Sequence, residues 1–229
     1  MKNLLLILIL PLFFFASCKT KTFFHYSTGL TKVELENENE ITGHFSKSYS
    51  DSIIYTTWYM TRDGFEFTLN NKTNHPMTLD WNGVSYIDEN GFSSRVIHND
   101  MRYINRNDFQ QPSIIPPHAS IMDIIIPTNN ILYSHYHYQN YSDNLNYGHR
   151  RGWVIADLFP YYTKNVDERN IWLNKYLGTD ISIYIPISVN GESYNYKFTF
   201  TINEITIQQK RPKGVLTITD KKDIPKGTL

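Results

Sequence analysis

The sequence of 229 residues lacks the residue types on which several classes of protein depend. It has one cysteine, Cys18, which excludes an internal disulfide and a zinc site built on several thiolates. Its 22 Lys and Arg side chains balance 22 Asp and Glu side chains, which excludes a strongly basic nucleic-acid-binding domain. We therefore expect no nucleic acid among its partners. Its hydrophobic content of 41% is nevertheless sufficient for a buried core.

The sequence also lacks the common catalytic motifs. It contains no Gly-x-Ser-x-Gly, no His-Glu-x-x-His and no phosphate-binding loop, and we expect a protein that is not an enzyme and holds no cofactor. One enzymatic alternative stays open, because a glycoside hydrolase needs only two carboxyl groups about 5–10 Å apart. The acidic residues that could supply them include Asp80, Asp88, Asp123 and Asp157, with Trp153 to stack on a sugar.

No hydrophobic run is long enough to span a membrane. The longest, Leu4 to Ala16, falls short of the ~20 residues that a spanning helix needs, and Pro11 interrupts it. A positive charge at Lys2, an apolar stretch and then small residues are typical of an export signal, so residues 1–17 are predicted to be a signal peptide.

The end of this segment, Phe15-Ala16-Ser17-Cys18, resembles the lipobox of bacterial lipoprotein precursors, with Phe15 in place of the usual leucine and Ser17 at the last small position. The resemblance implies cleavage before Cys18, a diacylglycerol on its sulfur and a further acyl chain, such as palmitate, on its amine. The lipid bilayer would then be the first partner, since each buried CH₂ contributes about 0.8 kcal/mol. The alternative is a free Cys18 after an ordinary signal peptide. No acidic cluster follows Lys19, and by analogy with lipoprotein sorting we expect the periplasmic face of the outer membrane of the cell envelope.

The exported part divides by composition into three segments. Residues 18–30 are predicted to be a lipidated tether, residues 31–209 a single domain, and residues 210–229 a basic, flexible tail. The alternative for the tail is a basic arm that contacts anionic lipid headgroups.

Alternation of apolar and polar residues predicts β-strands throughout the domain. Ile181 to Ser188 and Ser193 to Asn203 both alternate, and Asn190-Gly191 between them predicts a type I′ hairpin. Pro186 is expected at a sheet edge or a bulge. A second hairpin is predicted from Ile53 to Leu69 around Arg62-Asp63-Gly64. Further strands are predicted at Met77–Trp81, Val84–Ile87, Phe92–Ile97, Ser120–Ile126, Ile131–Tyr133 and Trp153–Leu158.

One helix is predicted at Glu168–Leu177, with Asp167 as N-cap and Gly178 just after the C-cap. Many short strands with frequent turns and a single helix indicate an all-β sandwich or barrel.

The domain also resembles a recurrent kind of bacterial lipoprotein that carries one immunoglobulin-like domain. The matching residues are Asn71-Lys72-Thr73, Asp80-Trp81, Asp88, Asn90-Gly91, Arg95 to His98, Ile115-Pro116-Pro117, Pro127, Gly152-Trp153, Leu158-Phe159-Pro160, Ile185-Pro186 and Tyr196 to Phe200. The resemblance implies an immunoglobulin-like antiparallel β-sandwich with one short helix and a long tyrosine-rich loop. It brings no assigned activity.

The candidate binding residues lie in two segments. Tyrosines recur from Tyr133 to Tyr162, and because they offer a rigid amphipathic surface, Tyr133, Tyr136, Tyr138 and Tyr141 with Trp153 are predicted to bind another envelope protein or a glycan. The alternative is that these rings only pack over one end of the domain. The second segment holds Arg95, His98, Arg102 and Arg106, which could bind a carboxylate or phosphate or could instead pair with Asp100 and Asp108.

No metal site is expected. The weak alternative is a set of imidazoles from His135, His137 and His149, with Asp143 as a further ligand. Together these observations predict a membrane-anchored envelope lipoprotein that acts as a non-catalytic binding or assembly module. The alternatives are the glycan hydrolase above and a structural lipoprotein without a dedicated site.

Overall fold

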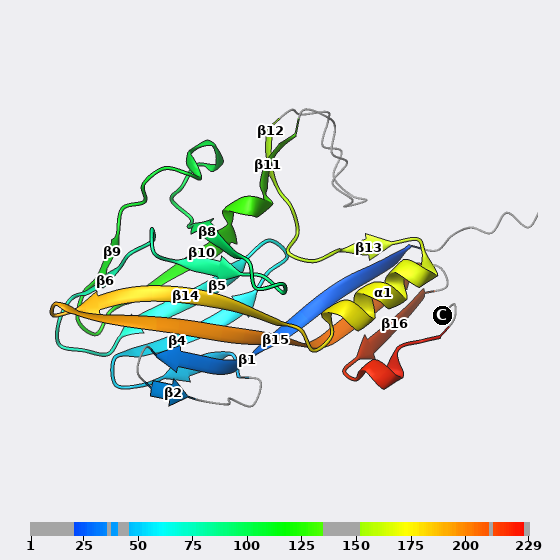
Figure 1. The fold of residues 1–229 in the computed structure, drawn as a ribbon, viewed down its shortest axis with the longest axis horizontal. Coiled ribbons are helices and arrows are strands. Elements are labelled where there is room, and N and C mark those ends of the chain that lie inside the picture. The colour runs from blue at the N-terminus through cyan, green and yellow to red at the C-terminus, as the bar shows by residue number, and fades with distance from the viewer. Residues whose placement is uncertain (1–20, 36–37, 41–45, 135–151, 211–212, 227–229) are drawn as a thin grey trace, which may run out of the picture.

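The computed structural model describes residues 21–35, 38–40, 46–134, 152–210 and 213–226 (Figure 1). Over these residues the fold is antiparallel β with a single α-helix, which confirms the all-β prediction. No helix in these ranges has both the length and the apolar character needed to cross a bilayer. Cys18 and residues 1–17 lie outside the described residues.

The described elements follow one another along the chain in this order. The strands are β1 (Thr22–Leu35), β2 (Glu38–Glu40), β3 (Ser48–Ser50), β4 (Ile54–Met60), β5 (Phe65–Asn71), β6 (Met77–Leu79), β7 (Ser85–Ile87), β8 (Ser93–Ile97), β9 (Ser113–Ile115), β10 (Ser120–Pro127), β11 (Ile131–Ser134), β12 (Gly152–Ile155), β13 (Tyr162–Thr163), β14 (Asp180–Val189), β15 (Glu192–Lys210) and β16 (Lys213–Ile218). The α-helix is α1 (Val166–Tyr176), and the 3₁₀ turns are η1 (Tyr103–Asn105), η2 (Thr128–Asn130) and η3 (Lys221–Asp223).

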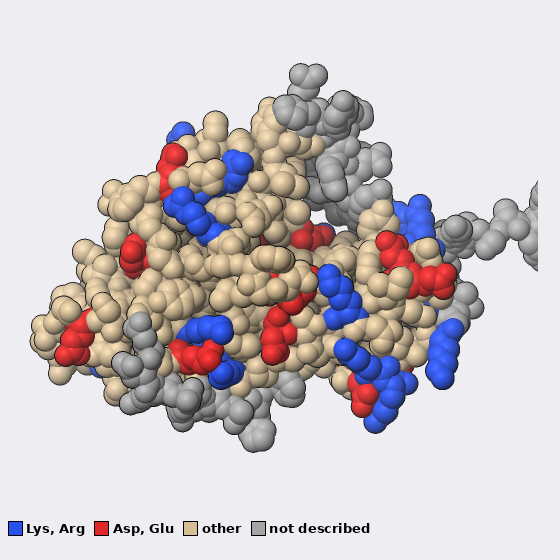
Figure 2. All heavy atoms as spheres, in the orientation of Figure 1, with Lys and Arg blue, Asp and Glu red and all other residues tan. Residues whose placement is uncertain are grey.

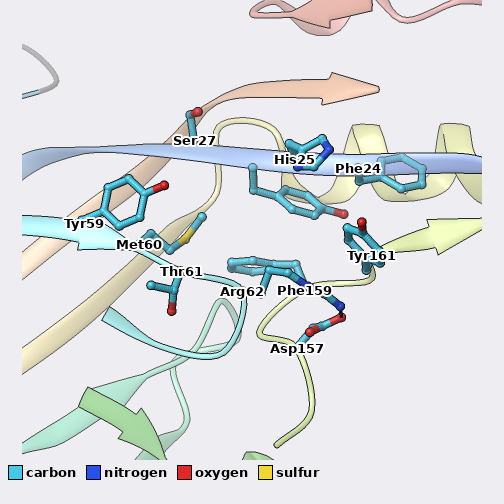
Figure 3. Close-up of a pocket in the computed structure, with 11 residues that line it drawn as sticks. Phe24, His25, Ser27, Tyr59, Met60, Thr61, Arg62, Asp157, Phe159 and Tyr161 are labelled. Atoms are coloured by element: carbon cyan, nitrogen blue, oxygen red, sulfur yellow. Dashed lines mark hydrogen bonds and ion pairs between the residues drawn. The ribbon is translucent and has the colours of Figure 1, made fainter. Parts of the chain in front are cut away.

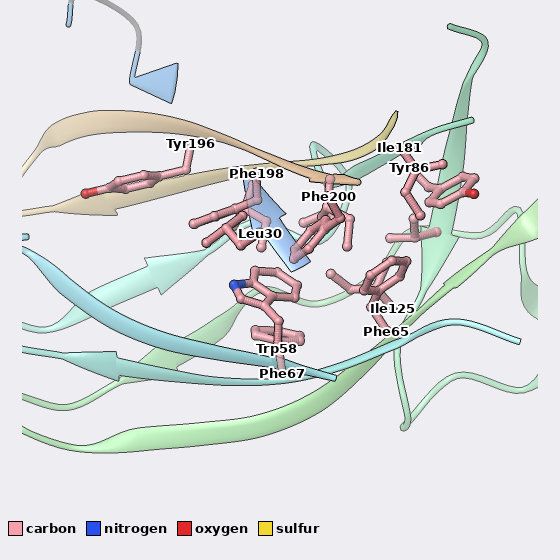
Figure 4. Packing of buried hydrophobic residues seen from close by; sticks show 14 of the residues in the cluster. Leu30, Trp58, Phe65, Phe67, Tyr86, Ile125, Ile181, Tyr196, Phe198 and Phe200 are labelled. Atoms are coloured by element: carbon pink, nitrogen blue, oxygen red, sulfur yellow. The ribbon is translucent and has the colours of Figure 1, made fainter. Parts of the chain in front are cut away.

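The strands form two facing layers with the core between them. One hydrogen-bonded path runs β13-β1-β15-β14-β7-β8-β10-β5-β4-β3, and it folds over so that β4 and β5 face β15. Trp58 of β4 lies 5.0 Å from Phe198 and 5.3 Å from Phe200 of β15, measured between ring centroids. Phe65 of β5 lies 4.9 Å from Phe200 (Figure 4). These contacts across the layers are consistent with a β-sandwich.

The strand β15 pairs with β14 through the predicted turn. Val189 pairs with Glu192, and Asn190 and Gly191 have φ angles of 52° and 82°, as a type I′ turn requires. The expectation for Pro186 was wrong, because β14 has partners on both sides. On its second side β14 pairs with β7 and then with β6, and Pro186 lies in the interval between these two partners, where a missing N–H breaks no ladder.

The first strand corrects the predicted tether. Residues 22–30 belong to β1, which pairs with β15 from the Thr22–Gln209 pair to the Leu35–Tyr196 pair. Phe23, Phe24 and Leu30 are buried. The polar side chains of His25 and Ser27 in this segment are exposed, as alternate residues of a strand can be.

The C-terminal segment likewise differs from the predicted flexible tail. Residues 213–218 form β16, which pairs with β15 from Ile205 to Lys210. Ile218 is fully buried in the core, although basic residues surround this strand in the sequence. The folded body therefore extends beyond both boundaries predicted for the domain.

The helix α1 lies at the end of the molecule where β1 begins and β16 pairs with β15 (Figure 1). Its N-cap is Asn165, whose side chain accepts a hydrogen bond from the Asp167 N–H, so the predicted cap at Asp167 was two residues too late. Gly178 has a φ of 79° and follows the C-cap, as predicted. Trp172 of α1 packs edge-on against Phe24, with ring centroids 5.4 Å apart.

Charges of both signs occur on the face of the molecule shown in Figure 2. On the face in Figure 2, basic and acidic side chains of the described residues are interspersed among uncharged ones. This distribution agrees with the zero formal net charge of the sequence.

Candidate binding pocket

A pocket of about 240 Å³ lies where three segments distant in the sequence meet (Figure 3). The first half of β1, the turn between β4 and β5, and the segment that follows β12 form its walls. The residues that line it are Phe24, His25, Tyr26, Ser27, Tyr59, Met60, Thr61, Arg62, Asp157, Phe159 and Tyr161.

The inner wall of the pocket is aromatic and held in place by a hydrogen bond. The ring of Tyr26 lies 5.1 Å from that of Phe159 and 6.0 Å from that of Tyr176 on α1. The Tyr26 hydroxyl donates to the Pro160 carbonyl, with an oxygen–oxygen distance of 2.8 Å. Burial, with smaller contributions from Tyr176 and Asp157, raises the pKa of Tyr26 well above its usual value. Tyr26 therefore stays neutral and its ring position is fixed.

The rim carries an ion pair stacked on a ring. Arg62 Nη2 lies 2.7 Å from Asp157 Oδ2, and the Arg62 guanidinium carbon lies 3.8 Å from the centroid of the Tyr161 ring. Both charged side chains are partly exposed, so the pair adds at most ~1 kcal/mol to stability. Its main effect is to fix the direction of the guanidinium and the carboxylate at the pocket mouth. His25 meets the same Tyr161 ring edge-on, with centroids 6.1 Å apart.

Hydrogen bonds within the turn hold the backbone beside this ion pair. In the turn from Thr61 to Gly64, the Thr61 hydroxyl lies 2.9 Å from Asp63 Oδ1 and accepts the Gly64 N–H at 3.1 Å. The Leu158 N–H donates to the Arg62 carbonyl at 2.7 Å, which joins this turn to the third wall of the pocket. The two partners of the ion pair are therefore held together through the main chain as well.

The lining residues of the pocket carry one carboxylate. Asp157 is the single carboxylate among the lining residues, and Arg62 occupies one of its oxygens. Hydrolysis of a glycosidic bond uses two carboxyl groups on opposite sides of the bond, and these lining residues provide one. In the described part of the chain, no group of three or more His, Cys, Asp and Glu residues is arranged to hold a metal ion.

The tyrosine-rich segment divides into two parts in the structure. Tyr133 and Trp153 pair across the β11–β12 hairpin with ring centroids 5.3 Å apart, and the Arg106 guanidinium lies 4.4 Å from the Trp153 centroid. The other part, with Asp157, Phe159 and Tyr161, lines the pocket. The remaining candidates of this segment lie outside the described residues: Tyr136, Tyr138, Tyr141, His135, His137, Asp143 and His149.

Of the four candidates for an anion site, Arg106 lies over the Trp153 ring, and the other three have different surroundings. Arg95 donates to the carbonyls of Asn107 and Asp108, at 2.8 and 3.1 Å. His98 is buried, stacks on Trp81 with centroids 4.3 Å apart and contacts Asp123 Oδ2 through Nδ1 at 3.2 Å. Arg102 is exposed at the start of η1. The contacts of Arg95 and His98 are thus those of residues that fix a loop and a core edge.

Several pocket residues, above all Arg62, His25 and Tyr59, are not among the binding residues predicted from the sequence. Arg62 stood in a predicted turn, and Asp157 was one of several scattered carboxylates. His25 lay in the segment predicted to be a tether. A signal was present in the alternation of Phe24, Tyr26 and Thr28 with polar residues, which is the pattern of a strand.

Comparisons with known proteins add no relative from which a function could be carried over. No family model, no curated protein and no solved structure matches this chain.

Proposed function

We propose that this protein is a lipid-anchored lipoprotein of the bacterial cell envelope that acts as a non-catalytic binding module through the pocket. The observation that carries the proposal is the ion pair between Arg62 and Asp157 at the mouth of an aromatic pocket. Ligand sites commonly combine apolar walls with a few fixed polar groups, and here those groups are oriented before any ligand arrives.

The anchor in this proposal is Cys18, acylated after removal of residues 1–17. The start of β1 supports a close approach of the pocket to the membrane, because Thr22 is fixed by pairing with Gln209 and Thr163. Only Lys19, Thr20 and Lys21 separate Cys18 from that strand. Because an extended chain spans at most ~3.6 Å per residue, Thr22 can lie no farther than about 15 Å from Cys18.

We also propose that the two-layer body is an immunoglobulin-like sandwich. The antiparallel pairing, the facing layers and the core of Trp58, Phe65, Phe198 and Phe200 support this assignment. The pocket lies beside this core, where the first half of β1 meets the end of β4 and the segment that follows β12.

The anchor is tested by changing the lipidated residue in the full precursor. We expect Cys18→Ser to lose both incorporation of a labelled fatty acid and sedimentation with membranes, since no thiol remains to accept the lipid. Ser17→Ala is the matched control, because it keeps a small residue before the cysteine and should keep both properties. Labelling of the Cys18→Ser variant would contradict the anchor.

Binding at the pocket is tested by a photo-reactive amino acid at one of two tyrosines of β4. Tyr59 lines the pocket and is 59% exposed. Tyr55 lies four residues earlier on the same face of the strand, is also exposed and does not line the pocket. Irradiation of intact cells should give an adduct, detected by mass spectrometry, at position 59 and not at position 55. Equal adducts at both positions, or none at position 59, would refute a pocket ligand.

A further inference from the structure

We infer that the ligand of this pocket is a neutral sugar residue, an uncharged ring with an apolar C–H face and hydroxyls at its edge. The inference rests on the proposed binding function and names its ligand class. It follows from the size of the pocket, from the charges at its mouth and from the placement of its aromatic and hydroxyl groups.

The size of the pocket limits the ligand to a small unit. Its volume of about 240 Å³ lies below the ~300–1,000 Å³ that is usual for drug-sized ligands. A single six-membered sugar ring is a unit of suitable size. A longer chain could enter only with one ring, and its other rings would remain outside.

The charges at the mouth favour a ligand without charge. Arg62 and Asp157 are the Arg and Asp of the lining and are paired with each other through Nη2 and Oδ2. A carboxylate ligand would have to compete with Asp157 for the guanidinium, and an ammonium ligand would have to compete with Arg62 for the carboxylate. A hydroxyl group avoids this competition, because it accepts a hydrogen bond from Arg62 while donating one to Asp157.

The remaining lining groups suit the two sides of a sugar ring. Tyr59 presents an exposed ring, and Phe159 and Tyr26 form an aromatic wall deeper in the pocket. Such rings pack against an apolar C–H face. The hydroxyl of Tyr161 belongs to the same lining and can meet a polar group at the ring edge (Figure 3).

The test compares sugars that share a ring and differ in charge. The chain from Lys19 onward, which keeps every described residue, is titrated by calorimetry or NMR with three sets of probes. The neutral set is glucose, galactose, mannose and N-acetylglucosamine; the acidic set is glucuronate and galacturonate; the amine set is glucosamine and galactosamine. We expect a neutral sugar to bind at least about tenfold more tightly than any acid or amine. Tighter binding of a charged sugar, or no binding by any neutral sugar, would overturn the inference.

Two variants test whether the ion pair between Arg62 and Asp157 sets the preference for uncharged sugars. Asp157→Asn removes the partner of Arg62 and should turn the preference toward the acidic sugars. Arg62→Gln should turn it toward the amines, and the use of both variants protects the test if one of them folds poorly. Tyr55→Ala removes an exposed tyrosine outside the pocket and should leave the preference unchanged. An unchanged preference in both folded charge variants would show that the ion pair does not meet the ligand.

The outcomes separate the ligand class from the proposed function. An adduct at position 59 without binding of any neutral sugar would refute the sugar and leave the binding function in place. Absence of the adduct would refute the binding function itself. A further measurement uses trisaccharides of the sugar that binds. If a trisaccharide binds more tightly than the free sugar, the natural ligand is a glycan; if it binds equally or more weakly, the natural ligand is the free sugar.

Discussion

At the scale of single residues, the turn between β14 and β15 depends on two left-handed backbone conformations. Gly191 has a φ of 82°, and a Cβ added there would meet no atom within 4 Å, so the cost of Gly191→Ala comes from the backbone alone. We expect a loss of about 1–2 kcal/mol in the free energy of unfolding. The measurement is urea denaturation followed by tryptophan fluorescence.

The control for this change is Gly214→Ala. A Cβ added at Gly214 would also meet no atom within 4 Å, but this glycine lies in β16 without a positive φ. Alanine should be tolerated there without loss, because it suits an extended backbone better than glycine does. Equal losses at Gly191 and Gly214 would contradict the role of the turn.

At the scale of elements, β16 is part of the folded body rather than a tail. We expect Ile218→Ala to lower the free energy of unfolding by about 2–5 kcal/mol, because it leaves a cavity in the core at a fully buried position. Val215→Ala, at a position of the same strand that is 67% exposed, should change it by no more than ~0.5 kcal/mol. Chemical denaturation of both variants measures the difference. A mobile tail would instead give two variants as stable as the unaltered protein.

At the scale of the whole molecule, two buried tyrosines and one partly buried tyrosine link stability to alkaline pH. Burial raises the pKa of Tyr26, Tyr86 and Tyr196 above the usual value of 10.0, and for Tyr196 a hydrogen bond to Asp51 raises it further. Above pH 10 the unfolded chain loses protons that the folded chain keeps, so the unfolded state binds fewer protons and stability falls as pH rises. Below pH 10 these tyrosines are protonated in both states, and their contribution to the free energy of unfolding is fully present.

The expected slope above pH 10 is about 1.4 kcal/mol per pH unit for each of these tyrosines, until the pH reaches the folded values. Thermal unfolding measured across this range, together with tyrosinate absorbance, checks the prediction. Tyr86→Phe removes one of the three titrating groups and should reduce the slope by about 1.4 kcal/mol per pH unit. A stability that stays constant through this range would show that these rings are accessible to solvent in the folded state.

The parts of the fold that the sequence predicts are those set by neighbouring residues. The β14–β15 hairpin follows from alternation around Asn190-Gly191, and the β4–β5 hairpin follows from alternation around Arg62-Asp63-Gly64. The N-cap predicted for α1, Asp167, was wrong, although Asn165 two residues earlier is also of a residue type that can cap a helix. The contact between Asn165 and the Asp167 N–H decides between them.

The parts that the sequence did not predict depend on contacts between distant segments. The composition of residues 22–30 alone predicts a tether. Their role as a strand follows from the pairing of β1 with β15, which places Phe24 and Leu30 in the core. The pocket has the same origin, since His25, Arg62 and Asp157 come together only after three segments have folded. No local pattern joins Arg62 to a carboxylate that lies 95 positions away.

The pairing of β1 with β15 also determines the order in which the molecule can assemble. Gln209 and Thr22, which contact each other in the finished sheet, are 187 positions apart. Contacts at such a separation slow folding, because the chain loses the entropy of closing a large loop before the contact can stabilise it. A nascent chain therefore cannot pair the start of β1 with β15 until the 187 positions between Thr22 and Gln209 have been synthesised.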